Sequence, residues 1–210
     1  MEVTLAQMLE AREQRVYRQT QLIREFGKPI VSFSMNIPGP IKDSPLIRRS
    51  FRAGIRELDH RLPRGTVLHR EVTEGVTGCE GFYVVDLEAA ALKAVTAAIE
   101  DEHSIGRLFD MDVIGTDLRK LDREAVGGGD RNCIVCGTPG RGCASRRLHS
   151  LERLTFEVWN IMGAHFRDED RNYVAAAAVE SLLQEVHTTP KPGLVDDRNS
   201  GSHADMDVST

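Results

Sequence analysis

The stretch GRLFDMDVIG, residues 106–115, places two aspartates one residue apart in an otherwise apolar run. Successive side chains of a β-strand point to opposite faces of the sheet, so Asp110 and Asp112 would share one face while Phe109 and Met111 occupy the other. This alternation predicts a strand that packs on a hydrophobic core. Two like charges on one strand face repel and are costly to bury unpaired, so basic side chains or a metal ion must meet them.

Helix and strand patterns alternate along the rest of the chain. Helical spacing of apolar residues is found over 3–26, 44–62, 88–102 and, as two helices broken near FRDED at 166–170, over 150–187. Strand patterns are found over residues 30–37, 65–75 and 82–87. Because several of these strands lie too close together for helical crossovers, we predict an α+β fold with a mixed β-sheet and flanking helices.

The aspartate pair is a candidate magnesium site. Mg²⁺ prefers hard oxygen ligands and bridges to substrate phosphates, and paired carboxylates serve this purpose in phosphoryl transfer. The run Asp110-Met111-Asp112-Val113 also resembles the acidic motif of the nucleotidyltransferase superfamily, so we expect a nucleotidyltransferase-like fold. A third carboxylate is expected on a neighbouring strand, and the candidates are Asp86, Asp117 and Asp122. The alternative is an exposed strand whose polar face is acidic without a function.

A second cluster of candidate ligands follows the strand. Cys133, Cys136, Cys143 and His149 have the spacing C-x2-C-x6-C-x5-H within a glycine-rich segment. Zn²⁺ takes this ligand set, and four protein ligands close a site that is structural and not catalytic. The alternative is a set of reduced thiols, with His149 at a helix start.

Basic and polar residues gather after the first predicted strand, where the turn Pro38-Gly39-Pro40 precedes a helix. Lysine and arginine at a helix start are suited to phosphate groups, although such a charge run is also typical of a solvated helix face. Within the opening stretch, Gly106 would let a backbone segment or a ligand approach closely. The predicted substrate-binding residues are Asn36, Lys42, Arg48, Arg49, Gly106 and Arg107.

The composition limits the class of partner. The formal net charge is −5, from 32 acidic and 27 basic residues, which does not favour nucleic acid as a partner. Local basic clusters fit a phosphorylated small substrate or an acidic protein. No stretch approaches the ~18 apolar residues of a membrane helix, and the first residues lack the pattern of a signal peptide. We therefore expect a cytoplasmic location and no membrane partner.

Several motifs in order resemble one family. The stretches AREQRVYRQTQLI, VSFSMNIPGPIKDS, TGCEGFYVVD, IGRLFDMDVIG and NCIVCGTPGRGCASRRLHS, within about residues 5–185, resemble the apo-citrate lyase phosphoribosyl-dephospho-CoA transferase (holo-citrate lyase synthase) family. This resemblance implies transfer of a prosthetic group from 2′-(5″-triphosphoribosyl)-3′-dephospho-CoA to a serine of the acyl carrier (gamma) subunit of citrate lyase, with release of pyrophosphate.

The resemblance also implies roles for the candidate residues. Asp110 and Asp112 would hold Mg²⁺ against the triphosphate, and one of them would assist loss of the serine proton. Lys42, Arg48 and Arg49 would offset the negative charge of the triphosphate and of the leaving pyrophosphate. Acyl carrier proteins are typically acidic, so a basic cluster near the cysteines could steer docking. The residues of that cluster are Arg141, Arg146 and Arg147.

The end of the chain carries a second resemblance. VHTTPKPGLVDDRNSGSHADMD, residues 186–207, resembles the opening of triphosphoribosyl-dephospho-CoA synthase. We expect a transferase domain over 1–187 and, over 188–210, a disordered tail that is the truncated start of a synthase-like domain without synthase activity. Two alternatives to the implied function stay open: a related transferase for another acyl carrier, such as that of malonate decarboxylase, and a non-enzymatic binding module held by zinc.

Overall fold

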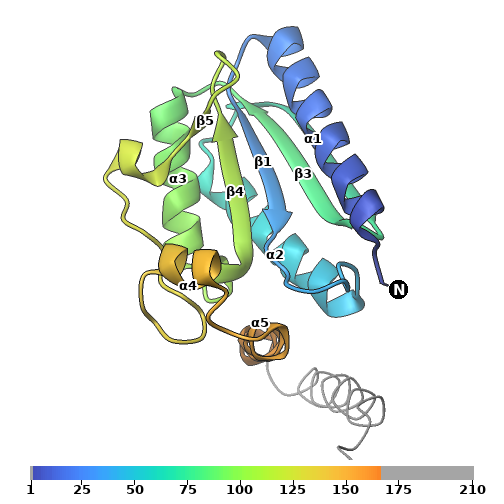
Figure 1. Cartoon of the computed structure of the whole chain (residues 1–210). Coiled ribbons are helices and arrows are strands. Elements are labelled where there is room, and N and C mark those ends of the chain that lie inside the picture. The colour runs from blue at the N-terminus through green and yellow to red at the C-terminus, as the bar shows by residue number, and fades with distance from the viewer. Residues whose placement is uncertain (1, 167–210) are drawn as a thin grey trace, which may run out of the picture.

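A computed structural model of the chain describes residues 2–166 (Figure 1). Its helices are α1 (Leu5–Phe26), α2 (Pro45–Arg61), α3 (Ala89–Glu102), α4 (Gly140–Arg146) and α5 (Leu151–His165). Its strands are β1 (Ile30–Met35), β2 (Val67–Gly75), β3 (Gly78–Val85), β4 (Phe109–Ile114) and β5 (Lys120–Leu121). The first three predicted helices are confirmed, each within two residues of its expected ends. The strand predicted over 82–87 begins four residues earlier than expected.

The five strands form one sheet in the order β2-β3-β1-β4-β5. Helix α2 links β1 to β2 across β3, and helix α3 links β3 to β4 across β1, which is the split βαβ arrangement. The predicted α+β class is confirmed. In detail, all four pairings are antiparallel, whereas we expected a mixed sheet. The reason is that each helical crossover skips one position, so that an antiparallel strand lies between the two strands it links.

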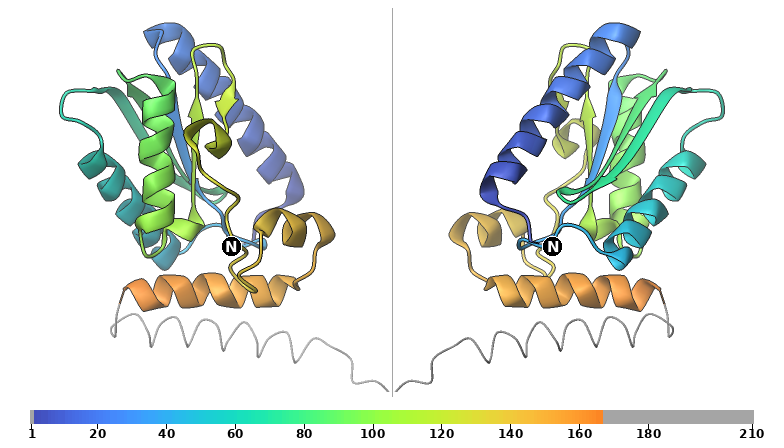
Figure 2. Two further views of the ribbon diagram at one scale, coloured as in Figure 1. Left: turned by 90° about the vertical axis from the view of Figure 1, so that its left-hand side faces the viewer. Right: turned by 90° about the vertical axis from the view of Figure 1, so that its right-hand side faces the viewer.

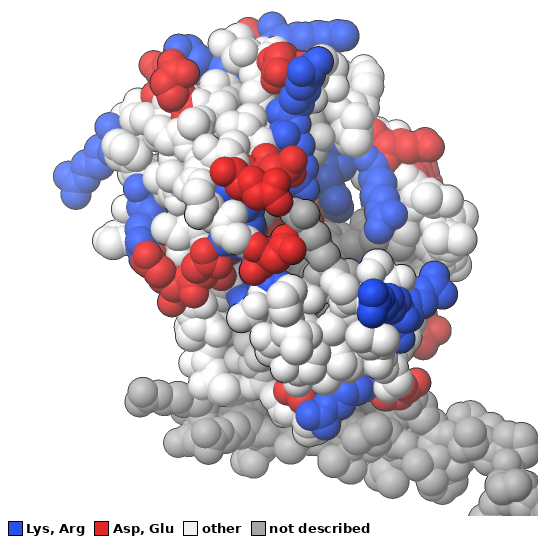
Figure 3. Space-filling view, turned by 60° about the vertical axis from the view of Figure 1, so that its left-hand side comes forward, with Lys and Arg blue, Asp and Glu red and all other residues white. Residues whose placement is uncertain are grey.

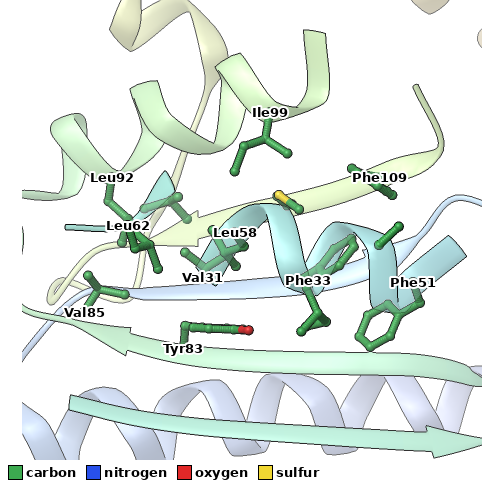
Figure 4. Close-up of a cluster of buried hydrophobic side chains, with 14 of the residues drawn as sticks. Val31, Phe33, Phe51, Leu58, Leu62, Tyr83, Val85, Leu92, Ile99 and Phe109 are labelled. Carbon is green, nitrogen blue, oxygen red and sulfur yellow. The ribbon is translucent and has the colours of Figure 1, made fainter. Parts of the chain in front are cut away.

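Helices cover the two faces of the sheet unequally (Figure 2). Helices α2 and α3 cover one face and enclose the main core, in which Phe33 stacks on Phe51 with ring centroids 4.7 Å apart and meets Phe109 edge-on at 5.3 Å (Figure 4). Helix α1 covers part of the other face, where Leu22 and Ile23 pack on the strands. Helix α1 packs mainly on β1 and β3; from β4, Ile114 joins this cluster, whereas Asp110 and Asp112 lie outside it.

Helix α5 packs under the start of α2 and forms a second apolar cluster with it. Val158 and Met162 of α5 meet Leu46 and Ile47 of α2, and Leu108 joins them from the turn before β4. Helix α5 ends at His165, close to the predicted break at 166–170. The predicted second helix, the domain boundary at 187 and the tail over 188–210 lie outside the described residues. None of the helices between residues 2 and 166 is long and apolar enough to cross a membrane.

Candidate active site

The predicted alternation of β4 is confirmed. Phe109, Met111 and Val113 are buried on the face that packs against α2 and α3, while the two aspartates point to the opposite face. In the pairing with β1, Asp110 lies opposite Ser34 and Asp112 lies opposite Ser32. The carboxylates therefore lie beside the short serine side chains of β1, with Asp110 exposed and Asp112 half-buried.

One cation meets the aspartate pair directly. The ammonium nitrogen of Lys120, in β5, lies 2.6 Å from Asp112 Oδ1. Burial lowers the pKa of Lys120, but the hydrogen bond to Asp112 and the charges of both aspartates outweigh it, so the net pKa is raised. Within residues 2–166, no hydrogen bond or ion pair reaches the Asp110 carboxylate. The surrounding protein and the charge of Asp112 raise the pKa of Asp110, although its side chain stays accessible to solvent.

Side chains from α3, together with Arg131, form hydrogen bonds with backbone groups at and before the start of β4, next to Asp110. Buried Lys93 donates to the Met111 carbonyl at 3.2 Å, and the Met111 amide donates to buried Glu100 at 2.8 Å. Arg131 donates to the carbonyls of Phe109 at 2.9 Å and of Gly106 at 2.6 Å. These bonds satisfy backbone groups that β5 is too short to pair, and they fix the strand that carries the aspartates.

Glu100 is the centre of a charged cluster beneath the site. Its side chain is 4% exposed, and its Oε2 lies 3.3 Å from Arg123 and 3.8 Å from Arg131. Burial raises the pKa of Glu100, while the neighbouring cations and the Met111 amide act in the opposite direction. The cluster holds both arginines near the aspartates. On the side of the molecule where α3 and β5 lie, acidic and basic side chains are intermixed at the surface (Figure 3).

A cavity of about 530 Å³ lies over the aspartate pair. Its lining includes both aspartates and five cations, which are Lys93, Arg107, Lys120, Arg123 and Arg131. A buried nitrogen of Arg107, Nη1, has no hydrogen-bond partner within the described part of the chain. Burial is the main reason why the pKa of Arg107 is lowered, and the charges of nearby arginines add to it. The cavity therefore offers cations on one side of the carboxylates.

A smaller cavity of about 150 Å³ meets the larger one at Asn36 and Asp110. Arg12, Arg15 and Lys42 line it. The Lys42 ammonium donates to the Ile37 carbonyl, and burial together with the charge of Arg12 lowers its pKa. Asp110 is thus flanked by basic groups from the N-terminal helix as well as by those from the segment after β4.

The structure brings only some of the predicted substrate-binding residues to the aspartates. Asn36, Lys42 and Arg107 line the two cavities. Arg48 and Arg49 line neither cavity. Arg48 donates to Asp43 at 2.6 and 2.7 Å, and this pairing raises the pKa of Arg48.

Two further predicted substrate-binding residues, Arg49 and Gly106, pack against other parts of the protein. The Arg49 guanidinium lies over the Phe166 ring, 4.4 Å from its centroid. Gly106 is buried against α3, and a Cβ there would lie 2.6 Å from the carbonyl oxygens of Ile99 and Glu100. Gly106 therefore permits the close approach of the α3 backbone.

Of the three candidates for a third carboxylate, only Asp122 lines the larger cavity. Asp86 pairs with Lys28 at another cavity, and Asp117 lies in the exposed turn after β4. Sequence reasoning missed Lys93, Lys120, Arg123 and Arg131 as site residues. For Lys120, the sequence feature that could have indicated a place in the site is the turn at 115–119, because a hairpin there brings Lys120 back beside β4.

The predicted cysteine and histidine cluster is assembled. One ligand atom from each of Cys133, Cys136, Cys143 and His149 lies within 4.8 Å of all the others. Three of these residues line the larger cavity, so the cluster adjoins the aspartate site. Arg146 and Arg147 are exposed nearby, at the end of α4.

Comparison with known proteins identifies matches along the whole chain. A family model described as apo-citrate lyase phosphoribosyl-dephospho-CoA transferase matches residues 3–165, and one described as ATP:dephospho-CoA triphosphoribosyl transferase matches 171–210. Protein CitXG of Leuconostoc mesenteroides subsp. cremoris is 32% identical over 218 residues, with 99% of this chain and 46% of that protein covered.

Two shorter relatives match the first part. A probable apo-citrate lyase phosphoribosyl-dephospho-CoA transferase of Streptococcus pyogenes serotype M5 (strain Manfredo) is 32% identical, with 81% of this chain and 91% of that protein covered. The apo-citrate lyase phosphoribosyl-dephospho-CoA transferase of Citrobacter koseri is 31% identical, with 82% and 93% covered. The chain thus spans less than half the length of Protein CitXG and most of the length of these two proteins. Both predicted resemblances are confirmed, and the chain belongs to the apo-citrate lyase phosphoribosyl-dephospho-CoA transferase family.

Proposed function

We propose that this chain transfers a phosphoribosyl-dephospho-CoA group from 2′-(5″-triphosphoribosyl)-3′-dephospho-CoA to a serine of the acyl carrier (gamma) subunit of citrate lyase and releases pyrophosphate. The observation that carries the proposal is the carboxylate pair of β4, which faces a cavity lined by cations in a chain of this transferase family. A triphosphate donor needs both a hard metal ion and basic side chains, and the described residues supply ligands of each kind.

In the proposed reaction, the serine oxygen forms a bond to the innermost phosphorus of the triphosphate. The bond between that phosphorus and the pyrophosphate oxygen breaks, and its electron pair leaves with pyrophosphate. The serine proton has to be accepted by a nearby base. We assign this role to Asp110, because its carboxylate lines both cavities and no hydrogen bond or ion pair within residues 2–166 engages its oxygens.

The donor atoms around the cavity fit magnesium. Mg²⁺ is usually held by one or two carboxylates together with substrate phosphates, and Asp110 and Asp112 would hold it here. The Asp110 carboxylate has no partner among residues 2–166 that would compete for its oxygens. Asp122 lines the same cavity and is the candidate for a third acidic group. When bound, the ion would neutralise charge that develops on the phosphoryl oxygens.

Two cations are best placed to meet the triphosphate. Lys120 is half exposed and lies beside Asp112, so its ammonium group can bind a phosphate in the same cavity. Arg107 has a buried guanidinium nitrogen without a partner in the described residues, and guanidinium groups bind phosphate oxygens well. Arg12 and Lys42 extend the basic surface on the other side of Asp110, where we place the leaving pyrophosphate.

The test is a transfer assay on purified protein with Mg²⁺ and the triphosphoribosyl donor. The apo-carriers of citrate lyase and of malonate decarboxylase are incubated separately, and intact mass is recorded for each. We expect the mass of one prosthetic group on the citrate lyase carrier, with one equivalent of pyrophosphate released. Modification of only the malonate decarboxylase carrier would replace the proposed substrate with the alternative one. No mass shift and no pyrophosphate with either carrier would overturn the proposal in favour of a binding module.

A further inference from the structure

We propose that Cys133, Cys136, Cys143 and His149 bind one structural zinc ion, and that this ion holds the segment which forms one wall of the cavity over Asp110. The inference is independent of the proposed reaction, because it concerns a metal with four protein ligands and no open position. It rests on the distances within the cluster, on one buried nitrogen and on the way the segment is fastened to β4.

The distances fit a tetrahedral metal. With Zn–S bonds of about 2.3 Å and Zn–N bonds of about 2.0 Å, tetrahedral ligand atoms lie roughly 3.5–3.8 Å apart. The four ligand atoms of this cluster all lie within 4.8 Å of one another, and the sulfurs of Cys136 and Cys143 are 3.4 Å apart. An ion between them therefore requires only small side-chain movements.

A buried histidine nitrogen supports the same conclusion. His149 Nε2 is buried and has no hydrogen-bond partner within the described residues. Leaving a buried polar atom without a partner costs about 1–3 kcal/mol, and a bond to zinc would remove that cost. The Thr138 hydroxyl lies 3.0 Å from the Cys136 sulfur and 3.4 Å from the Cys143 sulfur, so it can donate to a thiolate ligand.

The backbone at the first two cysteines turns as a metal-binding loop requires. The Val135 amide donates to the Cys133 sulfur at 3.5 Å, and the Gly137 amide donates to the Cys133 carbonyl at 2.9 Å. Gly137 follows Cys136 and has a φ of 72°, which only glycine adopts readily. This turn directs both sulfurs toward the same point.

The cysteine loop is fastened to the strand that carries the aspartates. The Gly140 amide donates to the Arg131 carbonyl at 2.9 Å, and the Arg107 guanidinium donates to the Asn132 carbonyl. Arg131 in turn donates to the carbonyls of Phe109 and Gly106, on either side of the turn before β4. Closing the loop on zinc would therefore hold Arg131 and Arg107 in the cavity wall, next to Asp110.

Metal analysis of protein purified without chelators tests the site. We expect about one zinc per chain, and release of that zinc when a thiol-blocking reagent is added, followed with a metallochromic indicator. Cys136→Ser should lose most of the zinc, whereas Cys79→Ala, which removes a thiol outside the cluster, should keep it. Wild-type protein without zinc, or full zinc retention in Cys136→Ser, would overturn the proposal. The wild-type release measurement decides the question even if Cys136→Ser does not fold.

Hydrogen exchange tests the effect on the cavity wall without any substrate. After zinc removal we expect peptides covering 131–149 and 106–112 to exchange at least about tenfold faster, while β3 stays unchanged. Equal exchange in zinc-loaded and zinc-free protein would show that the ion does not hold the wall. A zinc-bound protein that fails to modify a carrier would contradict the proposed function and leave the zinc site standing.

Discussion

Gly106→Ala separates a packing role of this glycine from a role in substrate binding. A Cβ at this position would lie 2.6 Å from the carbonyl oxygens of Ile99 and Glu100. Both are backbone atoms of α3, so no side-chain rotation can relieve the contact. Helix α3 would have to move, and with it Lys93 and Glu100, which bond the backbone of Met111 between the two aspartates.

The magnitude follows from two opposing effects. Overpacking of this kind costs about 1–3 kcal/mol, whereas replacing glycine by alanine in an unstrained backbone gains about 0.4–1 kcal/mol through the unfolded chain. Gly129→Ala is the matched control, because a Cβ there meets nothing within 4 Å. We therefore expect Gly106→Ala to be less stable than Gly129→Ala by about 2 kcal/mol, or roughly 4–8 °C in melting temperature.

The assay is urea unfolding of both variants, followed by transfer kinetics under conditions where both are folded. Displacement of α3 should lower kcat by up to about 100-fold, because small misplacements of reacting groups have effects of this size. Equal unfolding free energies for the two variants would refute the packing argument. A higher KM for the donor in Gly106→Ala, with stability unchanged, would instead show direct substrate contact.

The remaining predictions concern charged groups around the cavity. In a carbon-13 NMR titration, Asp112→Asn should lower the pKa of Asp110, because a repelling charge is removed. Lys120→Met should raise the pKa of Asp110. A shift of this pKa in the same direction in both variants would contradict the charge argument. Because Mg²⁺ binds the ionised carboxylate and competes with its proton, the Mg²⁺ concentration for half-maximal transfer by wild type should rise as the pH falls through the raised pKa of metal-free Asp110. Because burial raises the pKa of Glu100, neutral Glu100→Gln, which can still accept from the Met111 amide, should not lower the free energy of unfolding in urea; Glu100→Ala, which leaves that amide without an acceptor, should lower it by about 1–3 kcal/mol. Arg48→Met should keep transfer within about twofold and unfold at nearly the same urea concentration as wild type, because its ion pair is partly exposed; a large loss of activity would show that Arg48 acts in the site.

Features encoded over short distances in the sequence were predicted correctly. The alternation in GRLFDMDVIG placed Asp110 and Asp112 on the face away from the core, as the structure has them. The cysteines and His149 fall within 17 residues of one another, so their spacing alone indicated that they assemble. Helix ends also depend on residues close in the sequence, as the capping box of Thr4 and Gln7 illustrates.

Features that depend on distant parts of the chain were not predicted. The basic run at Arg48 looked like a phosphate site, but Glu74, which comes from the distant strand β2, pairs with both Arg48 and Arg52. The cations that do line the larger cavity, such as Lys120 and Arg131, come from a hairpin and a loop whose positions depend on strand register. The antiparallel sheet followed from crossovers that skip a strand, which local patterns do not specify.

The most direct measurement of the central claim compares transfer by Asp110→Asn with transfer by Asp117→Asn, a control in the exposed turn after β4. With donor and Mg²⁺ saturating for wild type, we predict a loss of at least about 100-fold for Asp110→Asn and a change within about twofold for Asp117→Asn. Because folding raises the pKa of Asp110, its ionised form is disfavoured in the folded state, and the neutral asparagine should not lower the unfolding free energy. Near wild-type transfer by folded Asp110→Asn would contradict the assignment of this carboxylate pair as the catalytic centre.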